Sequence, residues 1–192
     1  MRMVLVIGPS GSGKGTQAKL LAEKLKLPAI SMGDLLRQEA KTGSELGQKV
    51  QSQLVAGKWA PAELTFTILI SELKRHHEGV VLDGFPRLVE QLVMLENYLR
   101  KRGQKINRVI HLKVGDAESV RRLTKRAEID RQISGSSRHD DTKRVIEERL
   151  KSFHESIKPI LARVRRQGIL EEVDGERSVE KIHQDIMARL NG

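Results

Sequence analysis

The sequence contains no cysteine and no long apolar run. The absence of cysteine excludes disulfides, a thiol nucleophile and a cysteine-based zinc site. The apolar stretch at residues 3–7 is too short for a signal peptide, and no stretch approaches the length of a membrane span. We therefore expect a cytoplasmic protein with no membrane partner.

Aromatic residues are also scarce, and this bears on the partner of a strongly basic chain. The 35 Lys and Arg residues exceed the 25 Asp and Glu residues, which gives a formal net charge of +10 at pH 7. Nucleic acid is the obvious anionic partner for such a charge. With only 3% aromatic residues, however, few side chains can stack on bases. The basic residues are also interleaved with Glu, as on a solvated face, so we expect small polyphosphate substrates and not nucleic acid.

The remaining composition describes an ordinary folded protein. Apolar residues at 38% and charged residues at 31% exclude a disordered chain, and 192 residues suffice for one domain, 1–192, with a sizeable core. Apolar strand patterns alternate with helical patterns along the chain. This order predicts an α/β fold with a parallel sheet of about five strands covered on both faces.

Residues 4–25 carry the pattern around which the rest of the chain is organised. Four apolar residues at 4–7 predict a buried strand, a glycine-rich turn follows, and good helix formers begin at Gln17. The spacing from Gly8 to Gly13 and Lys14 fits the P-loop, with the hydroxyl residue one place late at Thr16. Unpaired N–H groups at a helix start suit phosphate, which Lys14 would also reach. A purely structural turn is the alternative, but strand, helix and lysine together favour phosphate binding.

A second stretch joins a strand to a carboxylate. Val80–Leu82 predicts a buried strand, which Asp83 ends at the edge of the sheet where α/β folds bind ligands. Asp83 is therefore expected to organise Mg²⁺, usually through water, with the Thr16 hydroxyl on the same side. Gly84 would let the backbone approach a ligand beside Arg87.

Two segments lack the apolar pattern of the main fold. Short helices with weak apolar stripes predict a small lobe at residues 31–60, in which Asp34 is expected to cap a helix. Residues 127–140 lose their apolar periodicity and predict a loop between two helices. Further on, Pro159 is expected to kink or split a long helix.

The motifs GPSGSGKGT, SMGDLLR, DGFPR and SRHDD resemble those of the adenylate kinases, in the same order and over essentially the whole chain. The resemblance implies a three-layer fold of the P-loop NTPase type with two mobile inserts, a nucleotide-monophosphate insert at 31–60 and a lid at 126–140. It also implies the reaction ATP + AMP ⇌ 2 ADP by direct in-line transfer with Mg²⁺, in a protein that is expected to be a monomer.

The resemblance also assigns residues to the site. The ATP-binding residues would be Gly11, Ser12, Gly13, Lys14, Gly15, Thr16, Arg126 and Arg177. The AMP-binding residues would be Met32, Arg37, Lys58, Trp59, Ala60, Gly84, Phe85, Pro86, Arg87, Gln91, Arg138 and Arg149. The catalytic residues would be Lys14, Arg87, Arg126, Arg138 and Arg149, and the magnesium residues Thr16 and Asp83. Arg122 and Arg131 are weaker candidates, and without the motif Gln91 would be an exposed polar residue of a helix.

Two alternatives remain at this stage. A UMP/CMP kinase would share the scaffold. The residue before Gly33 is usually Thr in adenylate kinases and Ala in the pyrimidine enzymes, whereas here it is Met32. Gln91 argues for AMP. A non-catalytic P-loop protein that binds RNA is the other alternative, but it would leave DGFPR and the lid arginines without a purpose.

Overall fold

A computed structural model of the chain describes residues 1–134 and 142–191. Its sheet has five strands, all parallel, in the order β2-β3-β1-β4-β5, which confirms the predicted fold class. The strands are β1 (Arg2–Ile7), β2 (Ala29–Ser31), β3 (Gly79–Asp83), β4 (Arg108–Lys113) and β5 (Leu170–Asp174).

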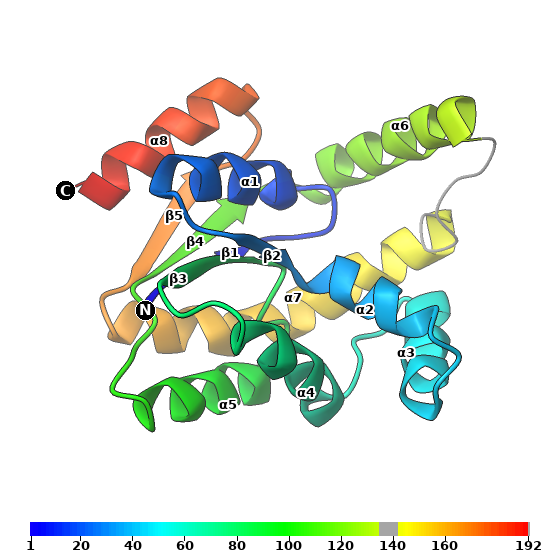
Figure 1. The fold of residues 1–192 in the computed structure, drawn as a ribbon. Coiled ribbons are helices and arrows are strands. Elements are labelled where there is room, and N and C mark those ends of the chain that lie inside the picture. Colours follow the sequence, from blue (N-terminus) through cyan, green and yellow to red (C-terminus); the bar gives the residue numbers. More distant parts are fainter. Residues whose placement is uncertain (135–141, 192) are drawn as a thin grey trace.

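Helices cover both faces of this sheet (Figure 1). The helices are α1 (Lys14–Leu25), α2 (Met32–Ala40), α3 (Glu45–Ala56), α4 (Ala62–Leu73), α5 (Val89–Arg100), α6 (Asp116–Ser134), α7 (Lys143–Arg166) and α8 (Val179–Asn191). Helices α1 and α8 pack on one face, and α4, α5 and α7 pack on the other. None of the helices in the described residues has the length and hydropathy needed to cross a bilayer.

The central strand explains why the apolar runs are continuous. In β1, Met3, Leu5 and Ile7 face the core shared with α4, α5 and α7, whereas Val4 and Val6 face the core shared with α1 and α8. All five side chains are at most 2% exposed. Burial on both faces therefore requires an apolar side chain at each of these positions, as parallel sheets generally do.

The strand order also fixes the place of a ligand site. Strands β1 and β3 are neighbours, and the connections that follow them run in opposite directions across the sheet, from β1 to β2 and from β3 to β4. Crevices form at such switch points, outside the carboxyl ends of the strands. Pairing in register places Val6 beside Asp83, and the N–H of Gly84 donates to the Val6 carbonyl at 3.0 Å. The loop after β1 and the acid after β3 therefore meet at one edge.

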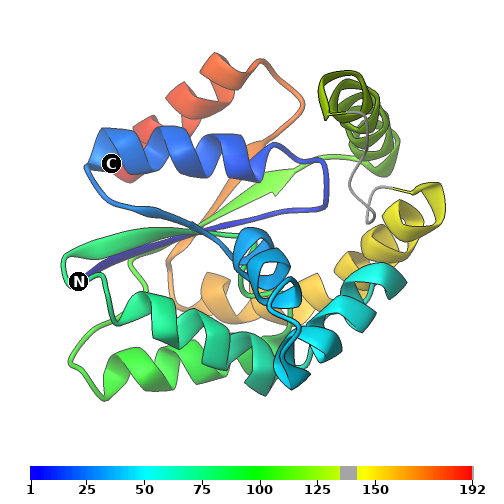
Figure 2. The same cartoon turned by 45° about the vertical axis from the view of Figure 1, so that its right-hand side comes forward.

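Two groups of helices project beyond this edge. Figures 1 and 2 show α6 on one side and α2 with α3 on the other. Helices α2 and α3 fall within the predicted insert at 31–60, and α6 includes the start of the predicted lid.

Three details differ from the sequence-based expectations. Helix α6 continues to Ser134 although its apolar stripe is lost, because residues 127–134 contain four good helix formers (Ala127, Glu128, Arg131 and Gln132) and neither glycine nor proline. The Oγ of Ser31, not Asp34, caps α2 by accepting from the Asp34 N–H at 3.4 Å. Of the kink or split expected at Pro159, the split does not occur: α7 is one helix, and the buried side chains of Ile157 and Ile160 hold both sides of the proline against the core.

Candidate active site

The loop between β1 and α1 has the backbone of an anion cradle. Gly11 and Gly13 have φ of 83° and 81°, in the left-handed region that favours glycine. A Cβ at Gly11 would lie 2.5 Å from the carbonyl oxygen of Ser119, so no side chain fits there. Gly13 caps α1, and no side chain of the described residues satisfies the first N–H groups of that helix. These donors are therefore available to an anion.

Lys14 lies on the floor of the site and has a strongly perturbed pKa. Its Nζ donates to the Pro9 carbonyl at 3.1 Å. Burial lowers the pKa of Lys14 from 10.5 to about 8, in spite of the opposing effect of Asp83. The other charged groups that lower this pKa are Arg87, Arg126 and Arg149. The structure thus brings these predicted catalytic residues together, whereas Arg138 lies outside the described residues.

A cleft of about 1190 Å³ opens over this cluster, a volume larger than that of an ordinary single-ligand pocket. Every predicted residue of the P-loop from Gly11 to Thr16 lines it. Arg75 lines it, paired with Glu72 at 3.0 Å. The arginines of the cleft that were candidates from the sequence are Arg37, Arg87, Arg122, Arg126, Arg149 and Arg177. They come from α2, the segment after β3, α6, α7 and the segment before α8, so elements far apart in the sequence supply one positively charged surface.

The residues predicted to organise a metal lie next to each other. Asp83 Oδ1 is buried and has no hydrogen-bond partner among the described residues. A Cβ at Gly15 would lie 3.2 Å from Asp83 Oδ2, so the carboxylate adjoins the turn of α1 that carries Thr16. The described residues contain no group of three or more His, Asp or Glu that could hold a metal alone. Oxygen donors that need further ligands from water and phosphate suit Mg²⁺.

Arg37 lies at the insert side of the cleft. Its Nη2 is paired with Asp34 Oδ1 at 2.6 Å, and its side chain is 30% exposed. A Cβ at Gly33 would lie 3.3 Å from both terminal nitrogens of Arg37. The small residue at 33 therefore leaves space for the guanidinium.

Several predicted AMP residues do not line the main cleft. Met32 and Phe85 have no exposed surface and pack in the larger core, and Ala60 is 6% exposed. Lys58 is exposed, and Trp59 and Pro86 line a smaller pocket beside Arg87.

Gln91 is 1% exposed, so it is not the exposed polar residue of the alternative interpretation. Its Oε1 accepts hydrogen bonds from the backbone N–H groups of Arg87 at 2.7 Å and Leu88 at 3.2 Å. These bonds close the N-terminus of α5 and fix the backbone that carries Arg87. Glutamine at the third position of a helix is a known capping signal, which sequence reasoning missed.

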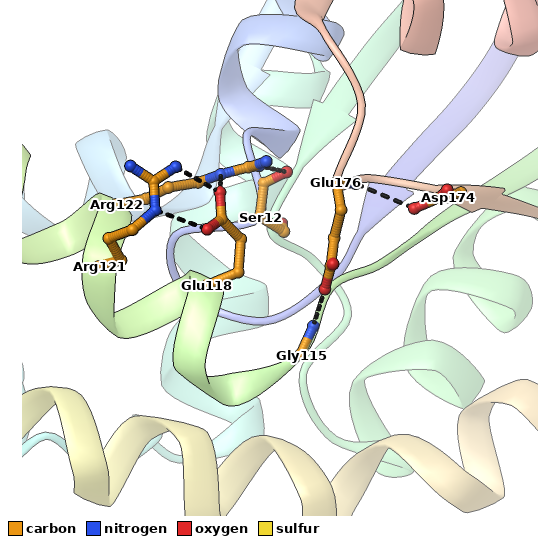
Figure 3. A network of polar contacts seen from close by, with 7 residues as sticks. All are labelled: Ser12, Gly115, Glu118, Arg121, Arg122, Asp174 and Glu176. Carbon is orange, nitrogen blue, oxygen red and sulfur yellow. Dashed lines mark hydrogen bonds and ion pairs between the residues drawn. The ribbon is translucent and has the colours of Figure 1, made fainter.

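Arg122 takes a more central place than its sequence indicated (Figure 3). Its Nη1 donates to the Ser12 carbonyl of the P-loop at 3.5 Å, and its Nε donates to Glu118 Oε1 at 2.6 Å. Arg121 also donates two bonds of 2.7 Å to Glu118, and the pair of arginines lowers the pKa of that carboxyl to about 2. The spacing of four residues from Arg122 to Arg126 was the signal, since it places both on one helix face.

Polar contacts also hold together the side of the cleft that lies at the start of α8, called here the α8 wall. Gln17 Nε2 donates to the Val179 carbonyl at 2.9 Å, which ties α1 to the start of α8. Arg177 is paired with Asp174 and Asp185, each at 3.1 Å. Gln17 and Val179 were not predicted, because their proximity depends on the packing of two distant helices. Arg131 lies in α6 but does not line the cleft.

Comparison with known proteins agrees with this arrangement. The sequence model of the family described as adenylate kinase matches residues 6–169. The chain is 38% identical to an adenylate kinase of Clavibacter michiganensis subsp. michiganensis over 100% of this chain and 94% of that protein. It is 38% identical to one of Thermobifida fusca, over 99% and 98% of the two chains. It is 39% identical to one of Prochlorococcus marinus (strain NATL2A), over 98% of each chain.

Proposed function

The chain belongs to the adenylate kinase family, and on that premise we propose that it transfers the terminal phosphoryl group of ATP directly to AMP, giving two molecules of ADP. The observation that carries the proposal is the cluster around Lys14. A lysine whose pKa is lowered to about 8 lies among three arginines in a cleft of about 1190 Å³. Strongly perturbed groups gathered in a cleft are typical of functional sites.

The chemistry requires this kind of cluster. In phosphoryl transfer negative charge spreads over the oxygens of the transferred group, so the protein has to position the reactants and supply positive charge. Lys14 would contact the phosphoryl group on the donor side. Arg87, Arg126 and Arg149 would clamp it, because a planar guanidinium matches phosphate oxygens with two donors. No side chain needs to act as a general acid or base.

The two substrates would occupy opposite ends of the cleft. On the donor side, ATP would lie along the P-loop residues Gly11–Thr16 with Arg126 and Arg177 nearby. On the acceptor side, AMP would lie near Arg37, Arg87 and Arg149, all of which line the cleft. Arg138 stays a prediction from the resemblance. Closure of the inserts at 31–60 and 126–140 would exclude water from the transfer; adenylate kinase is itself a standard example of such lids.

Magnesium is the proposed cofactor. The Thr16 hydroxyl and the Asp83 carboxylate would hold it, Asp83 through water, and the ion would neutralise charge on the phosphates. The support is the buried carboxylate oxygen Oδ1, which no group of the described residues satisfies. Action as a monomer in the cytoplasm remains a prediction from the sequence.

AMP is the proposed acceptor in preference to UMP or CMP. The position of Met32 does not separate them, since its side chain is buried in the core. Nothing in the described part of the site favours the pyrimidine enzyme or a non-catalytic RNA-binding protein. The latter would also leave the arginines of the cleft unexplained.

The proposal can be tested by chromatographic separation of nucleotides after incubation with ATP, AMP and Mg²⁺. Two ADP should form for each ATP consumed. Lys14→Met should reduce kcat by ~10³ or more, because it removes a charge that acts on the transition state. The matched control is Lys24→Met, at an exposed position in the last turn of α1. Equal loss in both variants, or wild-type turnover in a folded Lys14→Met protein, would contradict the proposal.

A further inference from the structure

Trp59, the only tryptophan in the chain, covers the guanidinium of Arg87. The residue lies between α3 and α4, at the end of the 31–60 insert. The Cζ atom of Arg87 is 4.5 Å from the centre of the indole ring. This distance is within the range of a cation–π contact, and tryptophan is the side chain that makes the strongest ones.

The indole ring is itself held by α7. Its Nε1 donates to the carbonyl oxygen of Ser152 and to the Oγ of Ser156, both at 3.4 Å. The ring and Arg87 also share the lining of a pocket of about 20 Å³ with Phe153 and Ile157. Trp59 therefore ends the insert in the sequence, but its side chain is hydrogen-bonded to α7 of the main domain.

Arg87 is restrained from two further directions. Its Nε donates to the Gly84 carbonyl at 3.0 Å, and Gln91 holds its backbone N–H. One edge of the guanidinium and one of its faces are thus occupied by protein groups, although Arg87 still lines the cleft and acts on the pKa of Lys14. An arginine that is already oriented loses less conformational freedom when it binds a phosphate.

We propose that Trp59 is a positioning residue for the acceptor nucleotide: it orients and partly desolvates Arg87, which then binds the phosphate of AMP. This inference rests on the proposed function, in which Arg87 belongs to the acceptor side. The indole ring contacts Arg87 directly, whereas it shares only the lining of the small pocket with the P-loop residues Gly8, Ser10 and Lys14. Its removal should therefore weaken AMP binding much more than ATP binding.

The experiment compares Trp59→Leu with Trp59→Phe. Trp59→Leu removes the aromatic face, and KM for AMP should rise about tenfold while KM for ATP stays within about twofold. Trp59→Phe retains a face for the guanidinium but loses the indole N–H, and it should recover most of the affinity for AMP. Circular dichroism melting curves identify a variant that has merely lost its fold.

A double-mutant cycle separates positioning from general structural support. In an Arg87→Ala background, Trp59→Leu should change KM for AMP by less than about twofold, since the group that it orients is absent. An undiminished effect of Trp59→Leu in that background would overturn the inference. An equal rise in KM for both substrates in the folded single variant would do the same.

Wild-type fluorescence provides a readout independent of turnover. The emission of this single tryptophan should change on titration with AMP and much less with ATP analogues at concentrations that fill the donor site. If the wild type forms no ADP from ATP and AMP, the proposed function fails. If it forms ADP but Trp59→Leu leaves KM for AMP unchanged, only the inference about Trp59 fails.

Discussion

Replacement of Lys14 by methionine should stabilise the nucleotide-free protein while it removes the activity. Burial and three arginines disfavour the ammonium group of Lys14 in the folded state, and Asp83 compensates only in part, so its pKa falls from 10.5 to about 8. Methionine has a similar length and no charge, and it can pack in the same space. Lys14, which the transfer requires, is therefore expected to lower the free energy of unfolding of the nucleotide-free protein.

The lowered pKa gives the size of this effect. Each pKa unit corresponds to about 1.4 kcal/mol, so the shift from 10.5 to about 8 corresponds to about 3 kcal/mol at pH 7. Solvent in the open cleft screens part of it, and we expect Lys14→Met to raise the free energy of unfolding by about 1–3 kcal/mol. For a domain of this length, this amounts to a rise in Tm of roughly 2–10 °C.

The effect should also depend on pH with a definite sign. Between about pH 8 and pH 10.5 the unfolded chain keeps a proton on Lys14 that the folded chain has released. The stability of the wild type therefore rises with pH over this window, relative to that of Lys14→Met. The difference in free energy of unfolding between the two proteins should be largest at pH 7 and should shrink toward pH 10.

Urea unfolding followed by circular dichroism measures this difference. The buffer should contain no phosphate or sulfate, because anions in the P-loop would stabilise the charged lysine. Lys24→Met, at an exposed site on the same helix, controls for loss of a lysine in general. A Lys14→Met protein that is less stable than the wild type at pH 7, by an amount that does not vary with pH, would refute the reasoning.

Three further predictions concern other parts of the site. Arg149→Ala should lower kcat/KM by on the order of 10² in a coupled assay, and Arg149→Lys should restore little, because the planar fork is lost. Gln91→Ala should lower kcat/KM for AMP by a factor that corresponds to about 1–3 kcal/mol, whereas Met32→Thr should change KM for AMP by less than about tenfold. A larger effect of Met32→Thr than of Gln91→Ala would contradict this prediction. Gly11→Ala should weaken ATP binding in calorimetry, since its Cβ would lie 2.5 Å from the Ser119 carbonyl; unchanged affinity would show that the loop can adjust.

The parts that could be predicted from the sequence are those encoded locally. The strand, glycine loop and Lys14 are consecutive, and Asp83 ends an apolar run, so each could be placed at the edge of a parallel sheet without knowledge of the packing. The glycines also predict a turn with positive φ, and Gly11 and Gly13 do have positive φ.

The parts that could not be predicted depend on contacts between distant segments. Trp59 meets Arg87 only because the chain returns from the insert to the core beside α7. The wall formed by Gln17 and Val179 requires α1 and α8 to be neighbours. The extension of α6 to Ser134 followed from helix propensity in a segment without an apolar stripe, where periodicity alone gives no signal.

The most direct test of the account is a comparison of acceptor nucleotides. The purified protein is given ATP and Mg²⁺ with AMP, CMP, UMP or GMP in turn, and diphosphate formation is followed in a coupled assay, with and without EDTA. We predict that AMP has the highest kcat/KM and that EDTA abolishes turnover. A higher kcat/KM for CMP or UMP would contradict the assignment as an ATP:AMP phosphotransferase, and absence of turnover with every acceptor would contradict the catalytic role of the cleft.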